Sequence, residues 1–258
     1  MAAKKLAGKN AIVTGGSRGI GRGIAHSLAA QGANVAFCHF NDDAKAAQTV
    51  TELEGLGVKS YAASCDVSSL NEIKTFYKAV SNELGQIDIL VNNAFQFYSF
   101  NPEKRKMHWQ LEWSDYQSQI DGTLKSTHGL IQAVLPAMLG KADGSIVNIA
   151  TNLVARPAVP YHEYTTAKAA LIGYSRNLAM ELGPLGVRVN SVAPGLVYPT
   201  DASRKTKEDI KENIISQTPL GRIASPEDIT GPVLFLASDW SRFMTGQTLF
   251  VDGGMVMG

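Results

Sequence analysis

Tyr164 and Lys168 are the two side chains whose types and spacing best fit an acid–base reaction. They lie four residues apart in a stretch with helical spacing, so both side chains would project from one face of a helix. A free phenol has a pKa near 10 and is a poor proton donor at neutral pH, whereas an adjacent ammonium stabilises the phenolate. We therefore expect Tyr164 to act as a proton donor whose pKa Lys168 lowers towards the working pH. A surface helix with an unrelated tyrosine and lysine is the alternative.

A glycine-rich turn follows the first apolar run. Residues 14–21 read Thr-Gly-Gly-Ser-Arg-Gly-Ile-Gly and lie between an expected strand and an expected helix. Glycines there let backbone N–H groups and the helix N-terminus approach a pyrophosphate, which the helix dipole also favours. The spacing Gly-x3-Gly-x-Gly differs from the Gly-x-Gly-x-x-Gly fingerprint. We predict a phosphate-binding turn, and a plain tight turn that needs glycine for steric reasons is the alternative.

The end of the second expected strand bears on the choice between NADPH and NADH. An acidic residue at this place accepts hydrogen bonds from the adenosine ribose and repels a 2′-phosphate. Here residues 37–40 read Phe-Cys-His-Phe, and Asp42 and Asp43 are better placed to begin the next helix. Arg18 in the glycine-rich turn can pair with a phosphate through its planar guanidinium. We therefore predict that the cofactor is NADPH.

Short β-branched or apolar runs alternate along the chain with stretches of helical spacing. The runs expected to form strands are residues 11–14, 34–38, 60–63, 87–92, 145–149, 187–193 and 248–251. The helical stretches include residues 21–30, 43–56, 71–84, 116–139 and 164–182. This alternation requires crossover connections, which produce a parallel sheet covered on both faces. We predict a single α/β domain over residues 1–258, a Rossmann-type doubly wound fold with a mostly parallel seven-stranded sheet.

Two long connections, residues 95–113 and 197–217, depart from this alternation. The second is polar and rich in Lys, Glu and Asp. The first carries the aromatic residues Phe95, Phe97, Tyr98, Phe100, Trp109 and Trp113. Long connections are often functional, and ligands bind outside the carboxyl ends of parallel strands. Because both connections follow strands, we expect them to form walls of one crevice. Packing of the aromatic residues in the core or in a subunit interface is the alternative.

The composition argues against several classes of function. Of the 258 residues, 45% are apolar and 18% are charged, and the net charge of +1 lacks the basic excess that binding to nucleic acid or an anionic membrane requires. Neither a signal peptide nor a membrane-spanning stretch is evident, so we expect a cytoplasmic protein. Cys38 and Cys65 lack partners at metal-site spacing. We interpret both as core residues and expect no metal.

Four motifs occur in an order that resembles the short-chain dehydrogenase/reductase family. They are the glycine-rich turn, residues 92–94 (Asn-Asn-Ala), the Tyr164–Lys168 pair, and residues 190–195 (Asn-Ser-Val-Ala-Pro-Gly). The resemblance covers nearly the whole chain. Within the family the sequence looks most like the β-ketoacyl-acyl-carrier-protein reductases of fatty acid biosynthesis and related carbonyl reductases.

The resemblance implies roles for particular residues. NADP(H) would be held by Gly15, Ser17, Arg18, Ile20, His39, Asp66, Val67, Asn92, Ala94, Pro194, Gly195, Val197 and Thr200, together with Tyr164 and Lys168. The substrate pocket would be lined by Phe95, Asn152 and Tyr161. Alternatively, Asp66 caps the following helical region and Asn92 satisfies strand ends. The resemblance also implies a homo-oligomer, a tetramer that pairs the fourth and fifth helices and the chain's end.

Three residues depart from the family pattern. The catalytic serine is Thr151 here, and its hydroxyl can make the same hydrogen bond. The asparagine of the fourth helix, which supports a water-linked proton path to the lysine, is Thr123. The glycine that follows residues 92–94 is Phe95, whose side chain should reshape the pocket near the nicotinamide. His162 could be a general base, but a packing or hydrogen-bonding role fits better because Tyr164 already has its lysine.

These observations favour an NADPH-dependent oxidoreductase that reduces a ketone to a secondary alcohol. A 3-oxoacyl thioester is the first candidate substrate, although the basic residues with which the family docks acyl carrier protein are poorly matched around Lys141 and Leu185. Another small ketone or a polyol is the alternative. A non-catalytic dinucleotide-binding sensor is a further hypothesis, which the changes at Thr151 and Thr123 permit.

Overall fold

Seven strands form one sheet in the order β3-β2-β1-β4-β5-β6-β7, and every neighbouring pair is parallel. The computed structural model of the chain describes residues 4–96, 98 and 100–257, so Phe97 lies outside the described residues. The strands are β1 (Asn10–Thr14), β2 (Asn34–His39), β3 (Ser60–Ser64), β4 (Ile89–Asn92), β5 (Gly144–Ile149), β6 (Val187–Pro194) and β7 (Thr248–Val251). The predicted doubly wound α/β fold with a seven-stranded sheet is confirmed.

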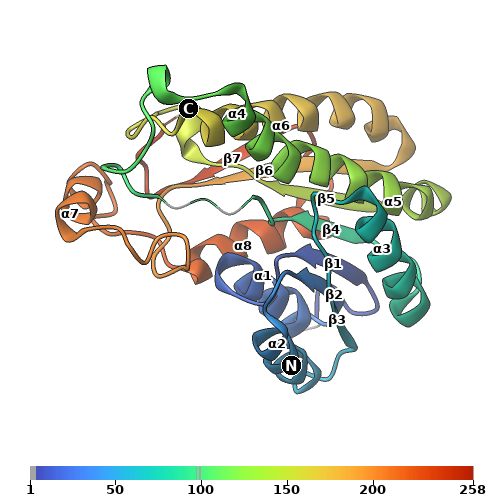
Figure 1. The fold of residues 1–258 in the computed structure, drawn as a ribbon. Coiled ribbons are helices and arrows are strands. Elements are labelled where there is room, and N and C mark those ends of the chain that lie inside the picture. The colour runs from blue at the N-terminus through green and yellow to red at the C-terminus, as the bar shows by residue number, and fades with distance from the viewer. Residues whose placement is uncertain (1–3, 97, 99, 258) are drawn as a thin grey trace.

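Helices connect the strands and cover both faces of the sheet (Figure 1). They are α1 (Gly19–Ala30), α2 (Asp43–Glu54), α3 (Leu70–Leu84), α4 (Trp113–Ile120), α5 (Ser126–Lys141), α6 (His162–Leu182), α7 (Glu208–Ser216) and α8 (Pro226–Ala237). Helices α1, α2 and α8 bury apolar side chains against one face, and α3, α5 and α6 bury theirs against the other. Within the described part of the chain, every helix is too short or too polar to cross a membrane.

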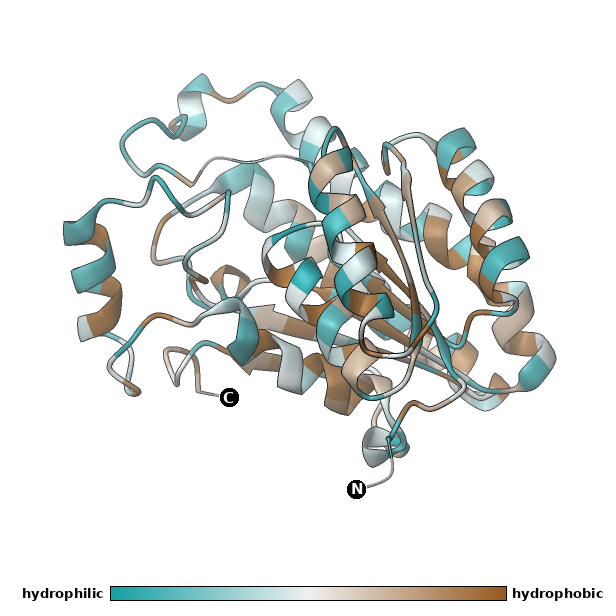
Figure 2. Ribbon diagram, turned by 90° about the horizontal axis from the view of Figure 1, so that it is seen from below, coloured by the Kyte–Doolittle hydropathy of each residue, from teal (hydrophilic) through white to brown (hydrophobic). Residues whose placement is uncertain are grey.

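Strand β1 shows why the central strands are apolar throughout. Ala11 and Val13 pack in one core cluster with Ile24 of α1, whereas Ile12 packs in the other cluster with Ile73 of α3. Successive side chains of a strand point to opposite faces, so a strand covered on both faces has no solvent-facing position. Figure 2 shows the same layering, with hydrophobic residues gathered in the sheet and on the helix sides turned towards it.

The helices differ in three places from the expected ones. The stretch 116–139 is divided among α4, a π-helical turn (Asp121–Lys125) and α5. Helix α7 lies inside the polar connection 197–217 and buries none of its residues. Helix α8 was not predicted, and it contains Gly231 and Pro232, which both lower helix propensity. Its buried apolar face packs in the same core cluster as α1 and outweighs that low propensity.

The register of the central strands brings their carboxyl ends to one edge of the sheet. Strand β1 pairs with both β2 and β4, so the strand order reverses there. At the end of β1 the Thr14 hydroxyl accepts hydrogen bonds from the backbone N–H groups of Asn93 (2.9 Å) and Ala94 (2.8 Å). Ligands of open α/β sheets bind beyond such a reversal. Helix α7 and the connection that leads to α4 lie on this same side of the sheet (Figure 1).

Candidate active site

A cavity of about 530 Å³ lies beyond the carboxyl ends of the strands and is lined from both long connections, as expected. Nearly all the site residues predicted from the sequence line it. They are Gly15, Ser17, Arg18, Ile20, His39, Asp66, Val67, Ala94, Phe95, Thr151, Asn152, Tyr161, Tyr164, Lys168, Pro194, Gly195, Val197 and Thr200. Asn92 and Thr123 are the two predicted residues outside this lining.

The glycine-rich turn leaves the N-terminus of α1 open to the cavity. Gly15 and Gly19 have φ values of +69° and +53°, a backbone region that disfavours residues with a Cβ. A Cβ at Gly21 would lie 2.1 Å from the carbonyl oxygen of Gly15, so the start of the helix can approach the turn this closely only with glycine. The helix has no side-chain cap at Arg18 and no acidic residue in its first turn. Its free N–H groups therefore fit an anion such as a pyrophosphate.

Four charged side chains meet beside this turn. Asp42 accepts a hydrogen bond from the Ser17 hydroxyl (3.1 Å). Arg18 donates from Nη1 to Asp201 (2.9 Å), and its Nε lies 3.9 Å from Asp42. Lys45 Nζ lies 3.8 Å from Asp201 and 3.9 Å from Asp42. Asp42 precedes α2 without capping it through its side chain. The expectation that Asp42 and Asp43 begin α2 is confirmed, and the Asp42 carboxylate also contacts the glycine-rich turn.

The far end of the cavity lies between β2 and β3. His39 is buried, and its Nδ1 lies 3.7 Å from Asp43 Oδ1. Asp66 Oδ1 accepts a hydrogen bond from the backbone N–H of Ser68 (2.8 Å) while the residue lines the cavity. Cys38 and Cys65 are 1% and 2% exposed and belong to one core cluster, so their interpretation as core residues is confirmed. Within residues 4–96, 98 and 100–257, no group of His, Cys, Asp or Glu side chains could hold a metal ion.

Tyr164, Lys168 and Thr151 converge on the cavity from α6 and the end of β5. Lys168 is 2% exposed, and its Nζ donates to the carbonyl oxygen of Ile149 (2.6 Å). Burial lowers the pKa of Lys168 to about 7. Burial also raises the pKa of Tyr164 well above its usual value, and a hydrogen bond with the Thr151 hydroxyl opposes this rise only in part.

The expectation that Lys168 lowers the pKa of Tyr164 is wrong for this structure. Lys168 Nζ lies over the Tyr164 ring, 5.9 Å from its centroid, and burial dominates the pKa of the phenol. Burial also favours the uncharged amine, so the electrostatic support available to a phenolate is weak. The phenol is thus held in its protonated form, which is the form that can donate a proton.

Asn92 and Thr123 lie behind the cavity wall. The Asn92 amide donates to Asn148 Oδ1 (2.8 Å), and the Asn148 amide donates to the Ser175 hydroxyl (2.8 Å). Asn92 thus joins β4 to β5, which is the strand-end role considered as its alternative, and Asn93 lines the cavity. Thr123 lies in the π-helical turn and is 1% exposed. Among the described residues its hydroxyl has no hydrogen-bond partner.

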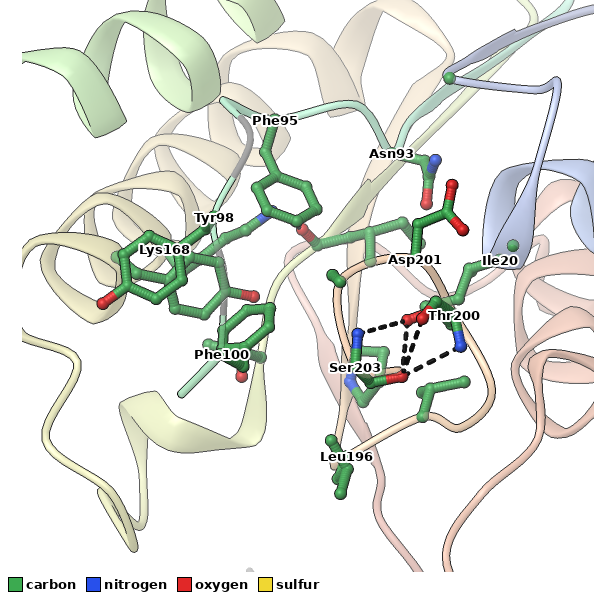
Figure 3. A pocket seen from close by; sticks show the side chains of 18 of the residues that line it. Ile20, Asn93, Phe95, Tyr98, Phe100, Lys168, Leu196, Thr200, Asp201 and Ser203 are labelled. Carbon is green, nitrogen blue, oxygen red and sulfur yellow. Dashed lines mark hydrogen bonds between the residues drawn. The ribbon is translucent and has the colours of Figure 1, made fainter. Parts of the chain in front are cut away.

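Aromatic rings surround Tyr164 on the substrate side. Phe95, Tyr98 and Phe100 have ring centroids 5.8, 5.5 and 5.0 Å from that of Tyr164. Lys168 Nζ lies 5.1 Å from the centroid of the Phe95 ring. Figure 3 shows Phe95, Tyr98 and Phe100 around Lys168 on one side of the cavity.

The opposite wall comes from the segment after β6. Thr200 and Ser203 are joined through their hydroxyls (2.8 Å), as the dashed lines of Figure 3 show. A Cβ at Gly19 would lie 3.8 Å from Thr200, so this segment reaches the phosphate-binding turn. Asp252, which lies near the end of the chain, contacts this wall. Gly195 approaches it closely, and the Asn152 amide donates to Asp252 Oδ2 (3.1 Å). The cavity therefore has a phosphate-binding side and an aromatic side within one enclosure.

Three singled-out residues lie away from the cavity lining. The ring centroid of His162 lies 5.7 Å from that of His108, and His162 does not line the cavity. Trp109 and Trp113 are 81% and 70% exposed, so neither packs in the core of this chain. Only the beginning of the aromatic connection therefore contributes to the site.

Some cavity residues were not singled out from the sequence. Asn93 and Leu196 are next to predicted residues, and sequence patterns locate such positions only approximately. Asp201 lies in an expected wall, but its partner Arg18 is 183 residues away, so no local pattern indicates the ion pair. Met255 reaches the cavity from the end of the chain and has no signal in the sequence.

The fold and the cavity together define a class of protein. The parallel sheet, the open phosphate-binding turn at α1, and Tyr164 with Lys168 on α6 facing one cavity are the combination found in short-chain dehydrogenase/reductases. The chain belongs to this family of oxidoreductases, since the family model described as "Enoyl-(Acyl carrier protein) reductase" matches residues 15–256.

Curated relatives are similar over almost their whole length. A 3-oxoacyl-acyl-carrier-protein reductase of Staphylococcus epidermidis is 37% identical over 249 residues, which are 96% of this chain and 99% of the relative. The enzyme of the same name from Staphylococcus aureus strain N315 is 38% identical over 250 residues, 96% and 98% of the two chains.

Solved structures share the fold. A 7α-hydroxysteroid dehydrogenase complexed with NADH and 7-oxo glycochenodeoxycholic acid has a TM-score of 0.90 at 32% identity, covering 99% of this chain and 97% of the other. A blue fluorescent protein from a metagenomic library, in complex with NADPH, has a TM-score of 0.88 at 34% identity, covering 98% and 100%. A 3-oxoacyl-acyl-carrier-protein reductase with bound NAD from Brucella melitensis has a TM-score of 0.86 at 31% identity, covering 98% and 95%.

Proposed function

We propose that this protein reduces a ketone to a secondary alcohol with NADPH, using Tyr164 as proton donor. The observation that carries the proposal is the convergence of Tyr164, Lys168 and Thr151 on a cavity that also contains an uncapped helix N-terminus. A bound nicotinamide dinucleotide supplies the hydride. The protein itself has to orient the carbonyl and deliver one proton to its oxygen.

Each of the three side chains has a separate task. The Tyr164 hydroxyl donates its proton to the carbonyl oxygen, which becomes an alkoxide-like base stronger than a phenolate. The raised pKa of Tyr164 therefore still permits the transfer, and it keeps the donor protonated. The Thr151 hydroxyl interacts with Tyr164 and is assigned the second task of orienting the carbonyl oxygen. Lys168 donates a hydrogen bond to the Ile149 carbonyl oxygen, and we assign to it the return of a proton to Tyr164 and a hydrogen bond to a ribose hydroxyl.

The residues present fit a dinucleotide. The free N–H groups of α1 and the positive φ values of Gly15 and Gly19 form a cradle that a Cβ would fill. Arg18 and Lys45 support a preference for NADPH because both are cations beside this cradle. Asp42 opposes a 2′-phosphate and Asp201 already pairs with Arg18, so the preference we propose is modest.

A 3-oxoacyl thioester is one candidate substrate, and the printed name of the curated relatives supports it. Another ketone or a polyol is the second candidate, supported by the aromatic residues beside Tyr164 and by the steroid ligand of a solved relative. A dinucleotide-binding sensor is the third candidate. The inward placement of both Tyr164 and Lys168 favours an enzyme over a sensor.

The test is NADPH oxidation with a panel of ketones and acetoacetyl thioesters, followed at the absorbance of the reduced cofactor. We expect turnover of at least one ketone by the wild-type protein and its loss in the Tyr164→Phe variant. NADPH binding by fluorescence titration should be equal in the two proteins. Cofactor binding without turnover of any carbonyl compound would support the sensor.

A further inference from the structure

Three aromatic side chains form a box beside the proposed proton donor Tyr164. They are Tyr98 and Phe100 of the aromatic connection, and Tyr161. Tyr98 stacks on the Tyr164 ring with an interplanar angle of 27°, and Phe100 meets it edge-on at 85°. Tyr161 closes the group, with ring centroids 5.5 Å from Tyr98 and 5.4 Å from Phe100. These angles and separations are those at which aromatic rings attract one another. Because these rings also line the cavity, a flat ring that enters it would meet aromatic side chains there.

A hydrogen bond to a carboxylate joins Tyr98 of this box to α6. The Tyr98 hydroxyl donates to Glu163 Oε1 (3.1 Å), and Glu163 is the neighbour of Tyr164 in α6. Burial and the Glu163 carboxylate raise the pKa of Tyr98 well above its usual value, so the donor stays protonated. Tyr98 is therefore held over Tyr164 by the same helix that carries the proton donor.

The aromatic side of the cavity holds one charged lining residue, Lys168, whose Nζ lies 5.1 Å from the centroid of the Phe95 ring. The charged residues that line the cavity are Arg18, Asp66, Asp201 and Lys168. Arg18 and Asp201 lie beside the glycine-rich turn, and Asp66 lies at the end of the cavity near β2 and β3. Lys168 donates a hydrogen bond to the Ile149 carbonyl oxygen. Around the box the lining is aromatic, aliphatic or amide-bearing, and it includes Leu153, Val159, Leu196, Ile210, Ile214 and Met255. Apart from Lys168, the lining beside the box carries no charged side chain among the residues that the structure describes.

Two cationic side chains close to the cavity, those of Arg156 and Lys207, have hydrogen-bond or ion-pair partners. Arg156 donates to the Met255 carbonyl oxygen (2.9 Å) and to Gln217 Oε1 (2.7 Å). Lys207 pairs with Glu103 (2.5 Å) on the opposite wall. These two cations are therefore already engaged, whereas Arg105 donates to Met107 Sδ and its charge acts on Tyr98 and Tyr161.

We infer that the substrate is a ketone with an aromatic or comparable flat ring beside the carbonyl, and that Tyr98 and Phe100 determine this specificity. The inference rests on the proposed ketone reduction. In that arrangement the ring lies against Phe100 and Tyr98 while the carbonyl oxygen faces the Tyr164 hydroxyl. A linear acyl chain can fill the same volume, but it makes no use of the edge and face contacts between rings.

The test compares matched ketones. An aryl methyl ketone, a linear 2-alkanone of the same carbon number and an acetoacetyl thioester are assayed with NADPH and the wild-type protein. We expect kcat/KM to be at least about tenfold higher for the aryl ketone than for the alkanone, which corresponds to the free energy of one or two aromatic contacts. A preference for the alkanone or the thioester overturns the inference and leaves the ketone reductase standing.

Variants assign the preference to residues. Tyr98→Leu and Phe100→Leu should each lower kcat/KM for the aryl ketone several-fold more than for the alkanone. Tyr98→Phe keeps the ring and loses the bond to Glu163, so it should retain most of the preference for the aryl ketone. Trp109→Leu is the matched control, because Trp109 belongs to the same connection but is 81% exposed and does not line the cavity. Equal losses for both ketones in the Leu variants would overturn the assignment.

A binding measurement keeps the two proposals separable. Calorimetric titration of the aryl alcohol into the protein with bound NADPH reports on the box without turnover, because neither molecule can accept a hydride from the other. We expect Tyr98→Leu and Phe100→Leu to weaken this binding about tenfold and Trp109→Leu to leave it unchanged. If no ketone is reduced while the aryl alcohol binds and the two variants weaken it, ketone reduction fails and the aromatic specificity of the pocket stands. Absence of aryl binding overturns the specificity itself.

Discussion

Replacing Lys168 by Met should make the stability of the protein less dependent on pH. The ammonium group is 2% exposed, and burial lowers its pKa from 10.5 to about 7. The folded protein therefore releases this proton above about pH 7, whereas the unfolded chain keeps it up to about pH 10.5. Between these values the unfolded state binds more protons, so the free energy of unfolding rises with pH.

The size of the effect follows from the two pKa values. A tenfold change in an ionisation constant is worth about 1.4 kcal/mol, so the wild-type protein should gain about 4 kcal/mol between pH 7 and pH 10 relative to the variant. In Lys168→Met the Ile149 carbonyl oxygen loses its donor, which costs roughly 1–3 kcal/mol. That cost is independent of pH and does not alter the slope.

Urea denaturation followed by circular dichroism from pH 6 to pH 10 measures both proteins. Lys74→Met is the control, since Lys74 is exposed on α3, and its stability should follow that of the wild-type protein at every pH. A difference between wild type and Lys168→Met that stays constant from pH 7 to pH 10 would refute the account of Lys168 as a desolvated amine.

Four further outcomes are expected. Tyr164→Phe should lower kcat by a factor of about 10² to 10⁴ without changing NADPH affinity or folding, because only the donating hydroxyl is lost. A rate above about a tenth of the wild-type rate, under conditions where chemistry limits kcat, would contradict the role of Tyr164 as proton donor. Thr151→Ser should keep most of the activity and Thr151→Ala should not, since only the hydroxyl contacts Tyr164. Asp201→Asn should strengthen NADPH binding several-fold relative to NADH by releasing Arg18, and unchanged competing fluorescence titrations would count against the pairing. Light scattering at micromolar concentration should show an oligomer, because Met180 on α6 is 80% exposed in the single chain and is apolar. A monomer would contradict this prediction.

At the glycine-rich turn, some features could be predicted from neighbouring residues in the sequence and others could not. Glycine at positions 15 and 19 indicates a turn after a strand, because positive φ values and close backbone approach are properties of a few consecutive residues. The contact of the Asp42 carboxylate with this turn could not be derived in this way. It depends on the loop after β2 folding back onto Ser17, which the neighbouring residues of Asp42 do not encode.

The sequence alone determined the alternation of strands and helices, the phosphate-binding turn and the common helical face of Tyr164 and Lys168. Each of these depends on periodicity or on conformational preferences of residues close together in the chain. Tertiary structure decided the protonation of the pair, because desolvation depends on what is packed around a side chain and not on its sequence neighbours. It also decided the π-helical turn that interrupts the expected helix and the stacking of Tyr98 on Tyr164. The stacking requires two segments distant in sequence to meet, and only the folded chain brings them together.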